Sequence, residues 1–110
     1  MKRYKIISVI PARCGSKRIK DKNIKMINGK PLLYYSIKQS LKSKLIDRTF
    51  VSTDSKKYQK IAKRYGAEAP FLRPKKISKD NSTDFECFKH IIKFLRKKSY
   101  YPDYIVHLRP

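Results

Sequence analysis

The chain has 110 residues, 40% of them apolar, which suffices for one domain with a modest core. Lys and Arg number 29 against 8 Asp and Glu, and the resulting formal net charge of +21 favours polyanionic partners such as nucleic acid, an acidic membrane or a polyanionic substrate. No apolar run approaches the roughly 20 residues of a membrane span, and the N-terminus does not resemble a signal peptide. Cys14 and Cys87 lack the spacing of a zinc or redox site. We therefore expect a cytoplasmic protein that does not associate with a membrane.

The expected secondary structure alternates between strands and helices. Residues 6–10 form an almost uninterrupted apolar run closed by Pro11, which is typical of a strand buried on both faces in a parallel sheet. The pattern then predicts a turn at 28–29 and a helix with Pro31 at its first position. A strand over 48–53 follows, then a helix capped by Asp54 or Ser55 and ended by Gly66. After a short strand over 67–72, the capping-box residues Thr83 and Glu86 open a further helix, and the last expected element is a strand over 103–108. This order predicts an α/β fold, a three-layer sandwich around a mainly parallel sheet.

Each expected helix carries one apolar face, and we expect these faces to pack against the sheet. The predicted inward residues are Leu33, Ile37 and Leu41 in the first helix, Tyr58, Ile61, Ala62 and Tyr65 in the second, and Phe85, Phe88, Ile92 and Leu95 in the third.

A cation-rich stretch, the basic segment (residues 13–22), follows the first strand and is expected to be a loop. Five of its ten residues are Lys or Arg, and they surround the pair Gly15 and Ser16. Backbone N–H groups in a turn can bind an anion, Arg offers a planar fork to phosphate oxygens, and Lys offers a compact charge. The segment therefore suits an oligophosphate, although a solvated basic turn fits the composition equally well. With only three glycines in the chain, the spacing matches neither a P-loop nor a dinucleotide fingerprint.

Ligands of open parallel sheets bind beyond the carboxyl ends of the strands. Three polar stretches lie at the carboxyl ends of expected strands: the basic segment, residues 52–54 and residues 107–110. We therefore expect these three polar stretches at one edge of the sheet, with Arg109 at the same edge as the basic segment.

The residues Pro11-Ala12-Arg13-Cys14-Gly15-Ser16-Lys17 and Lys22-Asn23-Ile24 resemble the opening motif of the CMP-sialic acid synthetase (acylneuraminate cytidylyltransferase) family, with Cys14 where the family has Gly. Further stretches similar to the family follow in the same order, at 28–32, 51–54, 65–68, 72–74, 80–82 and 107–110. Because family domains are longer, the resemblance implies that residues 1–110 are the N-terminal nucleotide-binding part of a single cytidylyltransferase domain, cut off at its C-terminal end. The implied fold is the Rossmann-like nucleotide-diphospho-sugar transferase type.

The resemblance also implies a reaction, in which the anomeric hydroxyl of an acidic nine-carbon sugar attacks the α-phosphorus of CTP and pyrophosphate leaves. Catalysis would rest on Arg13, Lys17 and Lys22, which neutralise charge on the phosphate oxygens. The implied nucleotide-binding residues are Ala12, Arg13, Gly15, Ser16, Lys22, Asn23, Arg73, Asp80 and Ser82. Mg²⁺ is implied as a cofactor with carboxylate ligands outside this chain, the full-length protein is expected to be a homodimer, and the 110-residue chain alone is expected to be inactive.

Several residues keep a second interpretation. Arg73 can equally form a structural corner with Pro74, and Asp80 and Ser82 can serve as a turn and cap before the third helix. His107 stands where many relatives have Gln, so a role in reading the base does not follow, and Asp54 fits a helix cap better than a metal site. The alternative function is a small basic protein that binds nucleic acid, with the tyrosines at 34, 35, 100, 101 and 104 stacking on bases. Residues after Pro110 would decide which acidic sugar is used.

Overall fold

The computed structural model describes residues 4–13, 21–78 and 83–110. Its centre is a three-stranded parallel sheet of β1 (Ile6–Pro11), β4 (Arg48–Ser52) and β5 (Tyr104–His107), in the order β4-β1-β5. Pro11 lies opposite Ser52, and Val9 lies opposite His107. The prediction of a buried central strand is confirmed, because β1 pairs on both edges and its residues 7–10 are buried.

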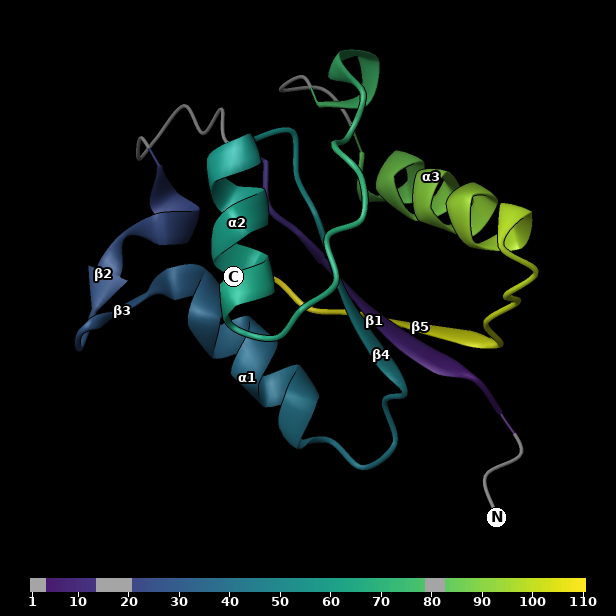
Figure 1. The fold of residues 1–110 in the computed structure, drawn as a ribbon, viewed down its shortest axis with the longest axis horizontal. Helices are drawn as coiled ribbons and strands as arrows, with labels where there is room; N and C mark the ends of the chain where they lie inside the picture. The colour runs from purple at the N-terminus through teal and green to yellow at the C-terminus, as the bar shows by residue number, and fades with distance from the viewer. Residues whose placement is uncertain (1–3, 14–20, 79–82) are drawn as a thin grey trace.

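Helices cover both faces of this sheet (Figure 1). On one face, α1 (Leu32–Lys42) and α2 (Lys56–Arg64) pack Leu33, Ile37, Tyr58 and Ala62 against Ile10 and Val51. On the other face, α3 (Asp84–Lys97) packs Cys87, Ile91 and Leu95 against Ile7, Val9 and Phe50. The expected α/β sandwich is confirmed. In the described part of the chain, no helix has the length and apolar character that crossing a bilayer requires.

The predicted inner faces were wrong at three positions, Phe85, Leu41 and Ile92. Ile92 is half-buried, belongs to neither core cluster and lines a hollow on the surface of α3. Phe85 is 68% exposed, and the buried row of α3 is formed by Cys87, Ile91 and Leu95. Since successive residues are about 100° apart around a helix, Phe85 points roughly 200° away from Cys87 and thus away from the sheet. Leu41 is 48% exposed because it packs at the edge of the core, over Gly66. A Cβ atom added to Gly66 would lie 3.1 Å from the Leu41 Cδ1 atom.

Most predicted helix ends are confirmed. Ser55 caps α2 by accepting a hydrogen bond from the Tyr58 N–H at 3.2 Å, and Gly66 follows that helix with a φ of +99°. At the start of α3, the Thr83 hydroxyl accepts from the Glu86 N–H at 3.2 Å, while the Glu86 carboxylate accepts from the Thr83 N–H at 3.1 Å. This reciprocal pair is the expected capping box. Pro31 immediately precedes α1 instead of occupying its first turn.

Short elements connect the main ones. A 3₁₀ turn, η1 (Lys22–Ile24), leads into the hairpin of β2 (Met26–Ile27) and β3 (Lys30–Pro31), and a second 3₁₀ turn, η2 (Lys75–Ile77), precedes α3. The expected turn at 28–29 is confirmed, with positive φ at both residues. The expected strand over 67–72 is wrong, because only Glu68 forms a bridge, to Phe50, and Pro70 has no N–H to continue a ladder.

Candidate functional site

A hollow of about 360 Å³ lies at the carboxyl ends of β1 and β5. It is bordered by the end of β1, by η1, by the segment before η2, by the start of α3 and by the residues that follow β5. Its lining residues are Pro11, Arg13, Lys22, Asn23, Arg73, Asp84, His107, Arg109 and Pro110. The expectation that the basic segment and Arg109 meet at one edge is therefore confirmed for Arg13 and Lys22, whereas Asp54 is not among the lining residues.

The two described ends of the basic segment are joined at this hollow. Asn23 is only 6% exposed, and its side-chain Nδ2 donates a hydrogen bond to the carbonyl of Arg13 at 3.1 Å. Asn23 also belongs to η1, whose first residue is Lys22. The contact between Asn23 and Arg13 therefore brings Lys22 to the same wall as Arg13, although nine positions separate the two cations.

Other predicted site residues fall elsewhere or outside the description. Ala12 is fully buried, and its N–H donates to the Ser52 carbonyl at 2.8 Å, so it joins the ends of β1 and β4. The remaining predicted site residues lie outside the described part of the chain: Gly15, Ser16, Lys17, Asp80 and Ser82. The same holds for Cys14, Arg18 and Lys20.

Arg73 combines a structural contact with a place at the hollow. The side chain is 6% exposed; its Nε donates to the Ser52 hydroxyl at 3.1 Å and its Nη2 donates to the Ser52 carbonyl at 2.9 Å. The backbone N–H of Arg73 donates to the Thr53 carbonyl at 2.7 Å. Within the described part of the chain, the hydrogen bonds of this guanidinium go to neutral groups. A buried cation without a carboxylate partner raises the local positive potential at the wall of the hollow.

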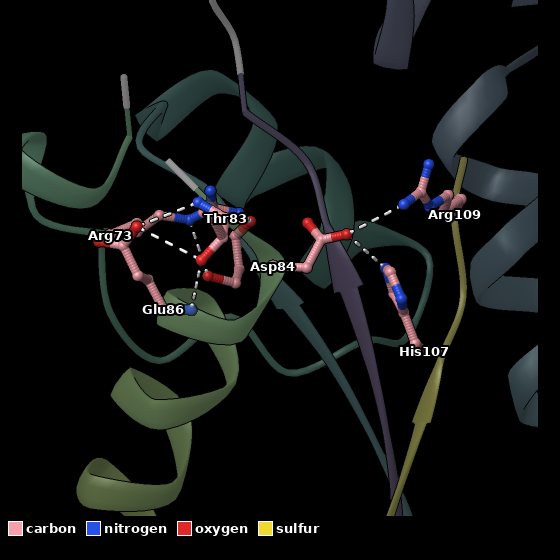
Figure 2. Close-up of polar contacts among 7 residues, drawn as sticks. Arg73, Thr83, Asp84, Glu86, His107 and Arg109 are labelled. Carbon is pink, nitrogen blue, oxygen red and sulfur yellow. Dashed lines mark hydrogen bonds and ion pairs between the residues drawn. The ribbon is translucent and has the colours of Figure 1, made fainter. Parts of the chain in front are cut away.

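Asp84 is a lining residue that the sequence did not identify. It is the first residue of α3, immediately after the cap Thr83, and its Oδ2 lies 3.2 Å from His107 Nε2 and 3.3 Å from Arg109 Nη2. Figure 2 shows the carboxylate pointing toward both partners. A carboxylate at the first turn of a helix is already explained by the helix dipole, so nothing in the local sequence indicated these two contacts.

Arg109 is held through its backbone and exposed at its tip. Its carbonyl accepts a hydrogen bond from the Ser36 hydroxyl of α1 at 3.0 Å, and its side chain is 80% exposed. The guanidinium therefore has a fixed origin and a solvent-facing end that can reach a bound anion.

The charges on the lining residues favour an anion. Arg13, Lys22, Arg73 and Arg109 bring four cations to the hollow, and Asp84 is the only carboxylate among its described lining residues. A metal cation finds no equivalent site, because the described residues contain no group of three His, Cys, Asp or Glu side chains able to hold a metal ion. Asp84 is also already paired with a His and an Arg. The described residues thus do not fit the implied Mg²⁺.

Two titratable side chains of α3 are influenced by Arg73 but add no charge to the site. Burial lowers the pKa of His90, and the nearby cations Arg73 and Lys93 lower that pKa further. Burial raises the pKa of the Cys87 thiol, an effect that the charge of Arg73 partly opposes. Both groups are therefore neutral near pH 7.

A larger hollow, of about 520 Å³, lies on α3 between Lys89 and Lys97. All of its lining residues come from this one helix, and none of the predicted site residues is among them. Nor do the tyrosines proposed for base stacking form one platform. Tyr34 packs edge-on against Tyr35 and Tyr65, while Tyr100 lies below the guanidinium of Arg48 at 4.7 Å.

The sequence of the chain is similar to those of known cytidylyltransferases. Residues 7–100 match a family described as cytidylyltransferase. The chain is 43% identical to the N-acylneuraminate cytidylyltransferase of Escherichia coli O18:K1:H7 over 102 residues, which are 93% of this chain and 23% of that protein. It is 39% identical to the pseudaminic acid cytidylyltransferase of Campylobacter jejuni over 101 residues, which are 92% of this chain and 44% of that protein.

Among solved structures, a CMP:2-keto-3-deoxy-manno-octonic acid synthetase complexed with CTP aligns with a TM-score of 0.74 at 23% identity. The alignment covers 96% of this chain and 39% of that structure, and at this identity it supports the fold. The chain thus spans less than half the length of each of these three proteins.

Proposed function

Because the chain belongs to the cytidylyltransferase family, we propose that the hollow at the carboxyl ends of β1 and β5 binds the triphosphate of CTP. The observation that carries this proposal is the convergence of four cations, with one carboxylate against them. Arg13 and Lys22 come from the two ends of the basic segment, Arg73 from the stretch before η2, and Arg109 from the residues after β5. Binding a triphosphate would also supply the counter-charge that the buried Arg73 lacks among the described residues.

The roles of the cations follow from their surroundings. Arg13 comes two residues after β1 and offers a planar fork to phosphate oxygens, whereas Lys22 offers a compact charge at the opposite end of the basic segment. We assign Arg13 to the transferred phosphate, and Lys22, together with Lys17, to the departing pyrophosphate. Arg73 raises the positive potential from within the wall, and Arg109 contacts the ligand from the solvent side. The amide of Asn23 braces Arg13.

The proposed reaction is the formation of a CMP-sugar and pyrophosphate from CTP and an acidic nine-carbon sugar. Two relatives support this substrate class, because their names specify N-acylneuraminate and pseudaminic acid. Stabilisation of charge on the transferred and leaving oxygens is the main task of a protein in phosphoryl chemistry, and a cation-lined hollow suits it. We place this reaction in the cytoplasm, consistent with the free thiol of Cys87.

Residues 1–110 are proposed to act as the nucleotide-binding part of a single cytidylyltransferase domain and to be inactive alone. This extent agrees with the share of each relative that the chain covers. Mg²⁺ would need ligands other than the described residues, and we assign none of these residues to it. The full-length protein is proposed to be a homodimer, as the resemblance to the family implies.

The test is calorimetric measurement of CTP binding to the 110-residue chain and to two charge-matched variants at low and high salt. Arg13→Ala should raise the Kd for CTP by roughly ten- to a hundredfold, since a charge-assisted hydrogen bond contributes about 1.5–3 kcal/mol. Lys42→Ala removes the same charge from an exposed position at the end of α1 and should change the Kd by less than about twofold at high salt. Equal losses in both variants that vanish at high salt would instead indicate a diffuse basic surface that binds any polyanion.

A further inference from the structure

Tyr58 connects the core of the protein to the basic segment. It lies on α2, is 1% exposed, and its ring packs in the cluster that contains Ile10, Leu33 and Val51. Its hydroxyl reaches out of this cluster and donates a hydrogen bond to Asp21 Oδ1 at 2.7 Å. The acceptor is thus anchored by a side chain that cannot move without disturbing the core.

Asp21 occupies the position where the chain enters η1. Its φ of 53° and ψ of 38° place it in the left-handed region, which Asp tolerates better than most residues. The Asp21 carbonyl accepts the Ile24 N–H at 3.1 Å, and the Lys22 carbonyl accepts the Lys25 N–H at 3.2 Å. The side chain of Asp21 is therefore tied to the core, while its backbone starts the turn that carries Lys22 and Asn23.

Lys22 consequently stands between two anchored neighbours. Asp21 on one side is held by Tyr58, and Asn23 on the other side is held by the Arg13 carbonyl. We propose that Tyr58 is a positioning residue for the triphosphate site, which acts through Asp21 to hold the backbone of Lys22 and Asn23 at the wall of the hollow. This inference rests on the proposed function, since it assigns Tyr58 to the same CTP site.

The physical reason is preorganisation. A turn that must be ordered when the ligand arrives loses conformational entropy on binding, and this loss lowers affinity. A turn held in place before binding avoids that loss and keeps its cation directed at the ligand. Tyr58 lies outside the lining of the hollow, so its removal would change affinity without removing a ligand contact.

The experiment compares CTP binding to the 110-residue chain and its variants. Tyr58→Phe keeps the ring and removes the hydroxyl, and it should raise the Kd for CTP by roughly three- to tenfold. Asp21→Asn keeps an acceptor oxygen and tolerates the left-handed backbone, so it should bind CTP nearly as well as the parent chain. Asp21→Ala should weaken binding as Tyr58→Phe does. In the double variant Tyr58→Phe/Asp21→Ala the loss of affinity should be smaller than the sum of the two single losses, because both changes remove the bond between Tyr58 and Asp21.

Two controls separate positioning from general loss of stability. Tyr65→Phe removes the hydroxyl of another tyrosine, at the end of α2. This hydroxyl makes no hydrogen bond with another described residue, so its loss should leave the Kd unchanged. Ser40→Ala removes the buried hydroxyl that lies 2.6 Å from both the Ser8 and Thr49 hydroxyls, so it should lower the Tm without changing the Kd. If Ser40→Ala weakens CTP binding as much as Tyr58→Phe at an equal loss of Tm, the effect is general destabilisation and the positioning role is overturned.

A second measurement does not depend on CTP. Without nucleotide, Tyr58→Phe should increase hydrogen exchange at the Ile24 and Lys25 amides severalfold more than at amides of β1. Faster exchange at these two amides in a chain that fails to bind CTP would refute the proposed function but keep the role of Tyr58 in holding the turn. Unchanged exchange, or an unchanged Kd in Tyr58→Phe when the parent chain binds CTP, overturns the positioning role while leaving the CTP site intact.

Discussion

The Asp84 carboxylate lies 3.2 Å from His107 Nε2, which links the start of α3 to the end of β5 across the hollow. Arg109 approaches the same carboxylate oxygen at 3.3 Å. In this position Asp84 supplies the only negative charge among the described lining residues, and a phosphate that approaches Arg109 must compete with it.

Replacing Asp84 should therefore tighten the binding of a triphosphate. For Asp84→Asn we expect the Kd for CTP to fall by roughly two- to fivefold at low salt, because a partly exposed charge contributes up to about 1 kcal/mol, and the gain should shrink at high salt. The same change at Asp103, which comes just before β5 and accepts from the Lys5 N–H at 2.7 Å, alters the net charge equally at the other end of that strand. Calorimetric titration of the two variants checks this prediction. Weaker binding in Asp84→Asn would show that the orientation of Arg109 and His107 matters more than the charge.

The Arg48 side chain should stabilise the fold through its planar shape. Its Nε and Nη2 donate to the two oxygens of Glu68 at 2.8 and 2.6 Å, and its guanidinium lies over the rings of Phe50 and Tyr100. Arg48→Lys keeps the charge but loses the two-pronged contact and the stacking, so the free energy of unfolding should fall by about 1 kcal/mol. Thermal unfolding should show a Tm lower by about 4–8 °C. Arg64→Lys, at an exposed position near the end of α2, should change the Tm little, and equal shifts in the two variants would rule out the special contribution of Arg48.

His90 should make the protein less stable in mild acid. Its ring packs edge-on against Phe71, with centroids 4.5 Å apart, and burial together with Arg73 and Lys93 lowers its pKa. Below the unfolded-state pKa of about 6.5, the unfolded chain takes up a proton that the folded chain refuses, so stability falls with decreasing pH until the folded-state pKa is passed. Urea unfolding of the parent chain and His90→Gln at several pH values between 5 and 8 measures this difference. Titratable groups that both chains share contribute equally to the two free energies of unfolding and cancel in their difference. If the free energies of unfolding of the two chains change with pH in parallel, the lowered pKa of His90 is contradicted.

Much of the architecture was readable from local patterns. The apolar run of β1, the caps Ser55 and Thr83, and the glycine after α2 depend on interactions within a few residues, so each could be recognised where it stands. Parallel pairing then placed Arg13, Lys22 and Arg109 at one edge, because the carboxyl ends of parallel strands lie together. The motif residues around Arg13 indicated the family before any contact was known.

The tertiary structure decided which residues meet within that frame. The apolar residues of α3 allow more than one inner face, and packing against Ile7 and Val9 selected Cys87, Ile91 and Leu95 while leaving Phe85 exposed. In the same way, the contact of Tyr58 with Asp21 joins side chains 37 positions apart, and that of Asp84 with Arg109 joins side chains 25 positions apart. Local propensity carries no information about such pairs, because their distance depends on how whole elements pack. The sequence by itself thus determined the main helices and strands, the edge of the sheet at which the cations lie and the family of the chain. Packing decided that residues 67–72 form no strand, how the cations are held and which carboxylate opposes them.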